Sequence, residues 1–207
     1  MKLEDKLVFV NVNTEYIKAL HEADSEVQYS KIGYDEKPFL GILVAQSETK
    51  YVIPLTSAKK KHLKWKDRYA DGRFLITGRE RRKTLPNNAI YKEIGEDEFV
   101  QRIYAATDVK KMIPVKEGLY EIVDLNYKEN DNADVRNYKI LQNKEYRACV
   151  KIMGHVARKA SSIYEKQQRT GKPQKYACSF AKLEKAMVEW HNSESSISEA
   201  LTVTNPL

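Results

Sequence analysis

Two apolar stretches joined by a short polar segment constrain the fold more than any other feature of this sequence. Residues 38–45 (PFLGILVA) predict a buried strand, 46–50 (QSETK) a hairpin turn, and 51–55 (YVIPL) the returning strand. Pro54 has no backbone N–H, which favours a sheet edge or the exit from a strand at this position. The chain is therefore expected to contain an antiparallel hairpin whose second strand leads into hydroxyl and lysine side chains.

The segments around this hairpin predict a small antiparallel sheet followed by helices. Leu7–Asn11 is a candidate first strand, and 14–23 (TEYIKALHEA) has apolar residues at helical spacing. Further elements are predicted in five segments: strands at 90–94, 111–115 and 119–123, and helices at 134–164 and 179–190. Strands followed by helices place the chain in the α+β class.

Positive charge is concentrated in two segments that lie far apart in the sequence. Residues 58–83 hold eleven Lys and Arg against three acidic residues, and 151–185 hold nine against two. Such asymmetry suits a phosphate-rich partner that is steered to one face of the protein. The alternative is a solvated charged loop.

Several kinds of site find no support in the sequence. There is no GxxxxGK[ST], GxGxxG or HExxH motif, and the four histidines are too scattered for a local metal motif, so no metal or cofactor is expected. Cys149 and Cys178 are predicted to be buried reduced thiols rather than a disulfide. The chain start does not resemble a signal peptide and no apolar run approaches ~20 residues, so a cytoplasmic location is expected.

Thr56, Ser57 and Lys59 follow directly after the strand predicted at 51–55. Hydroxyl groups can donate hydrogen bonds to a phosphoryl oxygen, and a lysine ammonium can neutralise charge that develops there. In RNA the 2′-hydroxyl beside the scissile phosphate is itself a nucleophile, so a site of this kind needs neither a metal nor a covalent serine. The alternative is that Thr56 and Ser57 merely end a strand and begin a turn.

The same segment resembles the ToxN/AbiQ family, the toxin endoribonucleases of type III toxin–antitoxin systems. The element at 54–59 (PLTSAK) is the most specific part of the resemblance, although Ala58 stands where many members have proline. Other segments resemble the family in the same order along the chain: 14–20 (TEYIKAL), 38–43 (PFLGIL), 112–115 (MIPV), 138–142 (YKILQ) and 176–184 (YACSFAKLE).

The resemblance implies a fold, an activity and a partner. The fold would be a compact, strongly bent antiparallel sheet or barrel akin to the MazF and Kid toxins, with long C-terminal helices, in one domain over residues 1–207. The activity would be metal-independent RNA cleavage that leaves 2′,3′-cyclic phosphate and 5′-hydroxyl ends. The partner would be a small antitoxin RNA of pseudoknot repeats, processed by the toxin and inhibiting it in a closed protein–RNA assembly. Phage defence by abortive infection or plasmid maintenance is the implied role.

Carried onto this sequence, the family's catalytic motif falls on Thr56, Ser57 and Lys59, with Lys59 expected to contact the scissile phosphate. Tyr34 and Lys37 lie where the family has further active-site groups. RNA contact is expected from a larger basic and aromatic set: Lys60, Lys61, His62, Lys64, Trp65, Lys66, Arg79, Arg81, Arg82, Lys83, Tyr138 and Gln142. Neighbouring lysines should keep His62 neutral, which ranks RNA binding before acid–base catalysis for this residue. Tyr138 and Gln142 could equally serve packing.

Residues 63–106 are interpreted as a basic insertion relative to shorter family members, whose Arg79, Arg81, Arg82 and Lys83 either extend an RNA groove or form a flexible surface lobe. Residues 59–88, which overlap this insertion, are expected to form a polar, partly ordered excursion. The tail from about residue 193 is expected to be mobile. Two other functions stay open. A non-catalytic RNA- or DNA-binding module would use the same basic face, although it would not need hydroxyls beside its lysine. A gyrase-directed toxin on a related barrel would not need two separated basic segments.

Overall fold

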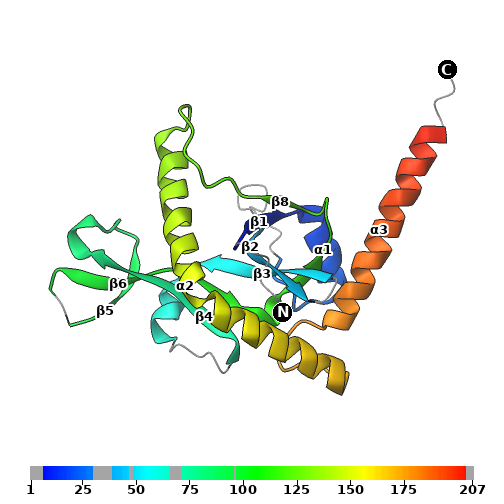
Figure 1. Ribbon diagram of the computed structural model, residues 1–207, viewed down its shortest axis with the longest axis horizontal. Helices are drawn as coiled ribbons and strands as arrows, with labels where there is room; N and C mark the ends of the chain where they lie inside the picture. Colours follow the sequence, from blue (N-terminus) through cyan, green and yellow to red (C-terminus); the bar gives the residue numbers. More distant parts are fainter. Residues whose placement is uncertain (1–6, 30–38, 47–48, 66–70, 96, 204–207) are drawn as a thin grey trace.

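The computed structural model describes residues 7–29, 39–46, 49–65, 71–95 and 97–203, in which eight strands form one sheet with helices packed against it (Figure 1). The strands are β1 Phe9–Val12, β2 Phe39–Gln46, β3 Thr49–Ser57, β4 Arg73–Arg81, β5 Ile90–Glu93, β6 Phe99–Asp108, β7 Ile113–Val115 and β8 Tyr120–Ile122. The α-helices are α1 Thr14–Ala23, α2 Ala133–Thr170 and α3 Phe180–Val203, and the short 3₁₀ helices are η1 Lys60–Lys64, η3 Arg82–Thr84 and η4 Val109–Lys111.

The sheet is open, and its described pairings are all antiparallel. Its strand order is β4-β6-β3-β2-β1-β8, with β5 added to β6 and β7 added to β3. Within the described residues the two ends of this path, β4 and β8, do not pair with each other. The α+β class with an antiparallel sheet and C-terminal helices is therefore confirmed, whereas closure into a barrel is not.

The hairpin predicted from the sequence consists of β2 and β3, which pair from Gly41↔Pro54 to Gln46↔Thr49. A Cβ atom at Gly41 would lie 2.1 Å from Val52 Cγ1, so the close approach of these strands requires glycine. β3 changes partner along its length, pairing with β7 at 50–52 and with β6 at 55–57. Pro54 lies at this change, where a strand tolerates a missing N–H.

The described parts of 59–88, residues 59–65 and 71–88, hold more regular structure than the polar excursion that the sequence predicts. They contain β4, a strand of nine residues that pairs with the ten-residue strand β6. Phe74 and Ile76 of β4 are buried in the main core, while Leu75 lies in a second apolar cluster on the other face. The sequence did not indicate β4, because pairing with β6 orders a segment that is rich in charged residues.

The other short strands lie where the sequence predicts them. β5, β7 and β8 fall within the predicted segments, and β1 overlaps the predicted first strand. Residues 63–106 therefore contribute strands to one end of the sheet. Their status as an insertion relative to shorter family members stays a prediction.

The helices begin and end at residues with recognisable capping chemistry. The bounds of α1 are those predicted, and the Asn13 side chain accepts a hydrogen bond from the Tyr16 N–H at 3.0 Å. Asn132 caps α2 in the same way, and Gly171 ends that helix in the left-handed conformation. α3 continues to Val203, and the mobility predicted for the tail from about residue 193 stays a prediction.

The long helices cover different parts of the sheet. α2 bends near its middle and packs against β4, β6 and η4, whereas α3 packs against α1 and β7 and then extends away from the body (Figure 1). Cys149 of α2 and Cys178 are both buried and free, as the sequence predicts. In the described part of the chain, no helix combines the length and the apolar character needed to cross a membrane.

Candidate functional site

The strand-end junction, defined here as residues 56–65, begins where β3 leaves the sheet. Ser57 pairs with Ala105 of β6 and its side chain is exposed, whereas the Thr56 hydroxyl donates a hydrogen bond to the Ala106 carbonyl at 3.0 Å. Thr56 therefore uses its hydroxyl proton inside the sheet. The residues opposite each other on paired strands share a face, so Ser57 points to the same face as Ala105, which belongs to the core that α2 covers.

A role in RNA binding would require His62 to lie on the surface, but its side chain is buried. The His62 side chain is 1% exposed, and its Nδ1 accepts a hydrogen bond from the Lys59 backbone N–H at 3.1 Å. The backbone N–H of His62 donates to the Lys59 carbonyl at 2.8 Å. Burial lowers the pKa of His62, and the charges of Lys61 and Lys59 lower it further, so the predicted neutral imidazole is confirmed in direction. His62 therefore fixes the backbone of Lys59 instead of contacting RNA.

Four lysine side chains of the junction point to solvent: Lys59, Lys60, Lys61 and Lys64. None of them forms an ion pair with a carboxylate in the described part of the chain. An unpaired lysine at the surface can neutralise a phosphate without first giving up a protein carboxylate. The junction is therefore a compact positive surface built on a rigid strand end.

Trp65 closes the junction and is more strongly held than a free stacking surface would be. Its ring lies 4.6 Å from that of His62, with the Arg73 guanidinium 5.2 Å above it, and it packs against the apolar cluster around Leu75. Its carbonyl accepts a hydrogen bond from Lys92 Nζ at 2.6 Å. This geometry favours a structural role for Trp65. Three other residues named from the sequence, Tyr34, Lys37 and Lys66, lie outside the described residues.

The arginine cluster, defined here as Arg79, Arg81, Arg82 and Lys83, lies at the opposite end of β4 from Arg73. Arg81 pairs with Phe99 of β6, six residues before Ala105, which corresponds to about 20 Å along an extended strand. The cluster is thus on the same sheet as the junction but not adjacent to it.

The three arginine side chains of the arginine cluster are already engaged within the protein. Arg79 and Arg81 lie 4.1 Å and 5.7 Å from the centre of the Phe99 ring, and Arg82 forms a two-point ion pair with Glu93. That contact raises the pKa of Arg82 and lowers the pKa of Glu93. Lys83 is exposed.

The two α2 residues named from the sequence differ in accessibility. Tyr138 is 49% exposed and can meet a ligand, whereas Gln142 is 4% exposed and is part of the packing. Glu145, one turn further on, is also buried, and burial raises its pKa to about 7. The prediction of RNA contact is therefore corrected for Gln142.

Part of the second basic segment, together with Arg147, forms a stripe along the exposed side of α2. Its members recur at spacings of three, four, seven or eight residues and are all exposed: Arg147, Lys151, Arg158, Lys166 and Arg169. Residues at these spacings share one helix face. The stripe faces away from the buried side of α2.

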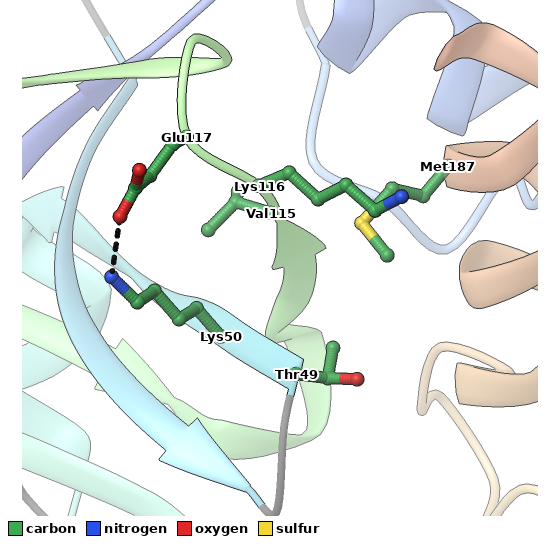
Figure 2. Close-up of a pocket in the computed structure, with 6 residues that line it drawn as sticks. All are labelled: Thr49, Lys50, Val115, Lys116, Glu117 and Met187. Atoms are coloured by element: carbon green, nitrogen blue, oxygen red, sulfur yellow. Dashed lines mark hydrogen bonds and ion pairs between the residues drawn. The ribbon is translucent and has the colours of Figure 1, made fainter. Parts of the chain in front are cut away.

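A metal site or a pocket elsewhere would be the alternatives to the junction within the described residues. No group of His, Cys, Asp and Glu side chains there could hold a metal ion. A pocket of about 240 Å³ lies at the other end of β3, between Lys50, Glu117 and Met187 (Figure 2). Lys50 is joined to Glu117 at 3.4 Å in that pocket, and the exposed hydroxyl and lysines of the junction are at the far end of the strand.

A polar cluster near the junction was not predictable from the sequence. Glu80, Arg102, Tyr104 and Lys144 come from β4, β6 and α2 and meet through side-chain contacts. Glu80 stands among arginines in the sequence, so its burial could not be inferred from its neighbours. Only the pairing of β4 with β6 brings its carboxylate within reach of the Tyr104 hydroxyl.

The fold and the site define an α+β protein with an open antiparallel sheet that presents hydroxyl and lysine side chains at the end of one strand. The chain belongs to the ToxN toxin family of type III toxin–antitoxin systems, whose family model matches residues 8–188. This confirms the resemblance recognised from the sequence.

Individual relatives agree with this assignment. The chain is 26% identical to endoribonuclease ToxN of Bacillus thuringiensis subsp. kurstaki over 203 residues, which cover 95% of this chain and 90% of that protein. A solved bacterial type III system, described as selective toxin inhibition by a non-coding RNA pseudoknot, matches with a TM-score of 0.62 and 26% identity over 90% of this chain and 99% of that chain. AbiQ, a lactococcal anti-phage endoribonuclease, matches with a TM-score of 0.57 at 21% identity, over 90% and 99% of the two chains, and supports the fold alone.

Proposed function

We propose that this protein is an endoribonuclease toxin of a type III toxin–antitoxin system and that it cleaves RNA at the strand-end junction. The observation that carries the proposal is the placement of Ser57 and Lys59, both exposed, at the end of β3, with the backbone of Lys59 held by buried His62. Relatives named as endoribonucleases and membership of the toxin family support the same activity.

In the proposed reaction the 2′-hydroxyl of the substrate attacks the adjacent phosphorus atom. The 2′-oxygen gives up its proton and bonds to phosphorus, the bond from phosphorus to the 5′-oxygen breaks, and the 5′-oxygen takes up one proton, so that protons are neither gained nor lost overall. The products are a 2′,3′-cyclic phosphate and a 5′-hydroxyl. Negative charge grows on the non-bridging oxygens, where the Lys59 ammonium neutralises it and the Ser57 hydroxyl donates a hydrogen bond.

Thr56 has a different part in this proposal. Its hydroxyl is bonded to the Ala106 carbonyl, so it holds the strand end in place and leaves substrate contact to Ser57. Tyr34 and Lys37 stay predicted as further active-site groups. The reaction needs no metal ion in this scheme, because the nucleophile belongs to the substrate and a lysine neutralises the negative charge that develops on the phosphate.

We propose a small antitoxin RNA as the partner, in line with the relative whose toxin is inhibited by a non-coding RNA pseudoknot. The exposed lysines of the junction, the exposed Tyr138 and the stripe along α2 are the surfaces offered for it. The role follows the family: phage defence or plasmid maintenance in the bacterial cytoplasm. A relation of the bent sheet to the MazF and Kid toxins belongs to the same proposal.

The test uses purified protein, a Ser57→Ala variant and a long single-stranded RNA, in EDTA. The expected result is cleavage by the wild type to 5′-hydroxyl and 2′,3′-cyclic phosphate ends, and loss of about 10²-fold or more in rate for the variant. Ser162→Ala, which removes an exposed hydroxyl from α2, is the matched control and should cleave normally.

The second candidate function is a non-catalytic RNA-binding module. The internal hydrogen bond of Thr56 favours it, because one of the two hydroxyls is already used by the fold. Intact RNA that binds in a salt-dependent way, with no cleavage by the wild type, would support the binding module and overturn the proposed enzyme.

A further inference from the structure

Strand β6 carries an irregularity directly beside the strand-end junction. Ile76 of β4 pairs with Ala105 and Thr77 pairs with Ile103, so Tyr104 has no partner on β4. A β-bulge of this kind re-aims a side chain and is often found next to active sites. The Tyr104 carbonyl accepts a hydrogen bond from the Ala58 N–H at 3.3 Å. Ala58 lies between Ser57 and Lys59, so the bulge holds the backbone that carries both proposed catalytic side chains.

The side chain of Tyr104 is held by Glu80, whose carboxylate also meets groups from β6 and α2. Its hydroxyl donates to Glu80 Oε1 at 2.9 Å, while Arg102 and Lys144 lie 3.3 Å and 2.7 Å from the same carboxylate. A Cβ atom at Gly78 would lie 2.3 Å from the Tyr104 hydroxyl, so only glycine lets the ring reach Glu80. The side chain of Glu80 is buried.

The charges in this cluster keep its hydrogen bonds in one arrangement. Burial alone would raise the pKa of Glu80, but the hydrogen bonds from Lys144 and Tyr104 and the charge of Arg102 outweigh it and lower the pKa. Burial also raises the pKa of Tyr104. Glu80 therefore stays ionised as the acceptor, and Tyr104 stays protonated as the donor.

We infer that Tyr104 and Glu80 are positioning residues for the strand-end junction: Glu80 holds the Tyr104 side chain, and the bulge at Tyr104 holds the Ala58 backbone between Ser57 and Lys59. Lys144 extends this link to α2, so the packing of that helix supports the geometry of the site. The effect on catalysis rests on the proposed ribonuclease function. The effect on the Ala58 backbone does not.

The first variant is Tyr104→Phe, which removes one hydroxyl and keeps the ring. Amide hydrogen exchange followed by NMR reports directly on the Ala58 N–H, and cleavage of a short RNA reports on kcat and KM. We expect Ala58 exchange to become about 10-fold faster, kcat to fall about 10-fold, and KM to stay within about twofold, because a small misplacement of catalytic groups costs turnover more than binding.

The matched control is Tyr164→Phe. The Tyr164 hydroxyl donates to Glu184 at 2.9 Å, so this variant also removes a tyrosine–glutamate hydrogen bond between packed elements, but away from Ala58. It should lose comparable thermal stability while leaving Ala58 exchange and kcat as in the wild type. Equal changes in both variants would reduce Tyr104 to a general contributor to stability and overturn the inference.

The second pair of variants addresses Glu80. Glu80→Gln keeps a carbonyl acceptor for Tyr104, whereas Glu80→Ala removes it. We expect Glu80→Ala to match Tyr104→Phe in Ala58 exchange and kcat, and Glu80→Gln to recover much of both. Unchanged Ala58 exchange in Tyr104→Phe and Glu80→Ala would overturn the inference, even if kcat falls. Absence of cleavage by the wild type would instead overturn the proposed function, and Ala58 exchange would still decide the positioning role.

Discussion

The strand-end junction and the arginine cluster carry similar positive charge but differ in what surrounds that charge. The lysines of the junction are exposed and have no carboxylate partner among the described residues, and Lys59 is anchored through its backbone by His62. In the arginine cluster, Arg82 is bound to Glu93, and Arg79 and Arg81 lie over Phe99. A lysine whose backbone is held in place keeps its ammonium group available to a ligand. An arginine whose guanidinium already contacts a carboxylate or an aromatic ring has to break that contact first.

The largest difference between the two regions is expected from single substitutions. Lys59→Ala should lower kcat for RNA cleavage by about 10²- to 10³-fold, the cost of removing one group that stabilises developing charge. Arg82→Ala should change kcat by less than about threefold, because the guanidinium already serves Glu93. Single-turnover cleavage of a short RNA measures both, with Lys60→Ala as the control for simple loss of one positive charge. Equal losses in Lys59→Ala and Arg82→Ala would contradict the comparison.

The elements predicted correctly from the sequence are those whose pattern is local. The β2–β3 hairpin and α1 were predictable because apolar periodicity, a polar turn and Asn13 as N-cap all lie within a few residues of each other. β4 was missed because its sequence, RFLITGRER, contains glycine and four charged residues. Arg79, Glu80 and Arg81 meet their β6 partners only after the two strands pair, and the bulge at Tyr104 interrupts the alternation of β6 itself.

The candidate site was predictable in its chemistry but not in its support. Thr56, Ser57 and Lys59 follow an apolar run, so their place at a strand end could be inferred. The burial of His62 could not, because it lies among lysines and becomes buried only when η1 folds back and its Nδ1 meets the Lys59 N–H. The Thr56 hydrogen bond likewise depends on Ala106, fifty residues further along the chain.

The second prediction concerns this buried histidine. The folded-state pKa of His62 lies below the unfolded value of about 6.5, so the unfolded chain binds more protons at acid pH and the folded protein loses stability as pH falls through about 6.5. His62→Ala removes this dependence and the anchor of Lys59, so kcat should fall about 10-fold. Thermal unfolding between pH 5 and pH 8 should show the wild-type Tm falling more on acidification than the Tm of the variant.

Surface-exposed His155 provides the control for the second prediction. His155→Ala should keep the wild-type dependence of Tm on pH and the wild-type kcat. If wild type and His62→Ala lose stability in parallel on acidification, protonation of His62 does not cause the loss of stability. The burial of His62 then has no consequence for the junction.

The third prediction compares the two regions by salt dependence. Replacing Lys60, Lys61 and Lys64 with glutamine should lower the slope of log Kd against log salt by about 2, because each phosphate contact on single-stranded RNA contributes about 0.7. Replacing Arg79, Arg81 and Arg82 in the same way should lower the slope by less than about 1. Fluorescence anisotropy with a labelled RNA and an uncleavable 2′-deoxy scissile nucleotide measures the slopes. A larger slope change from the arginines would reverse the assignment of the main RNA-binding surface.

The smallest effect is expected from releasing a guanidinium that the fold now holds. Glu93→Gln removes the carboxylate that binds Arg82, so Arg82 becomes available to phosphate and RNA affinity should rise about two- to threefold at low salt. Glu98→Gln is the matched control, because it removes an exposed negative charge near Arg82 without touching the ion pair. If both variants raise affinity equally, the gain reflects net charge alone. A gain confined to Glu93→Gln means that the ion pair is what separates the arginine cluster from the junction, and that the cluster can be converted into an RNA-binding surface by one substitution.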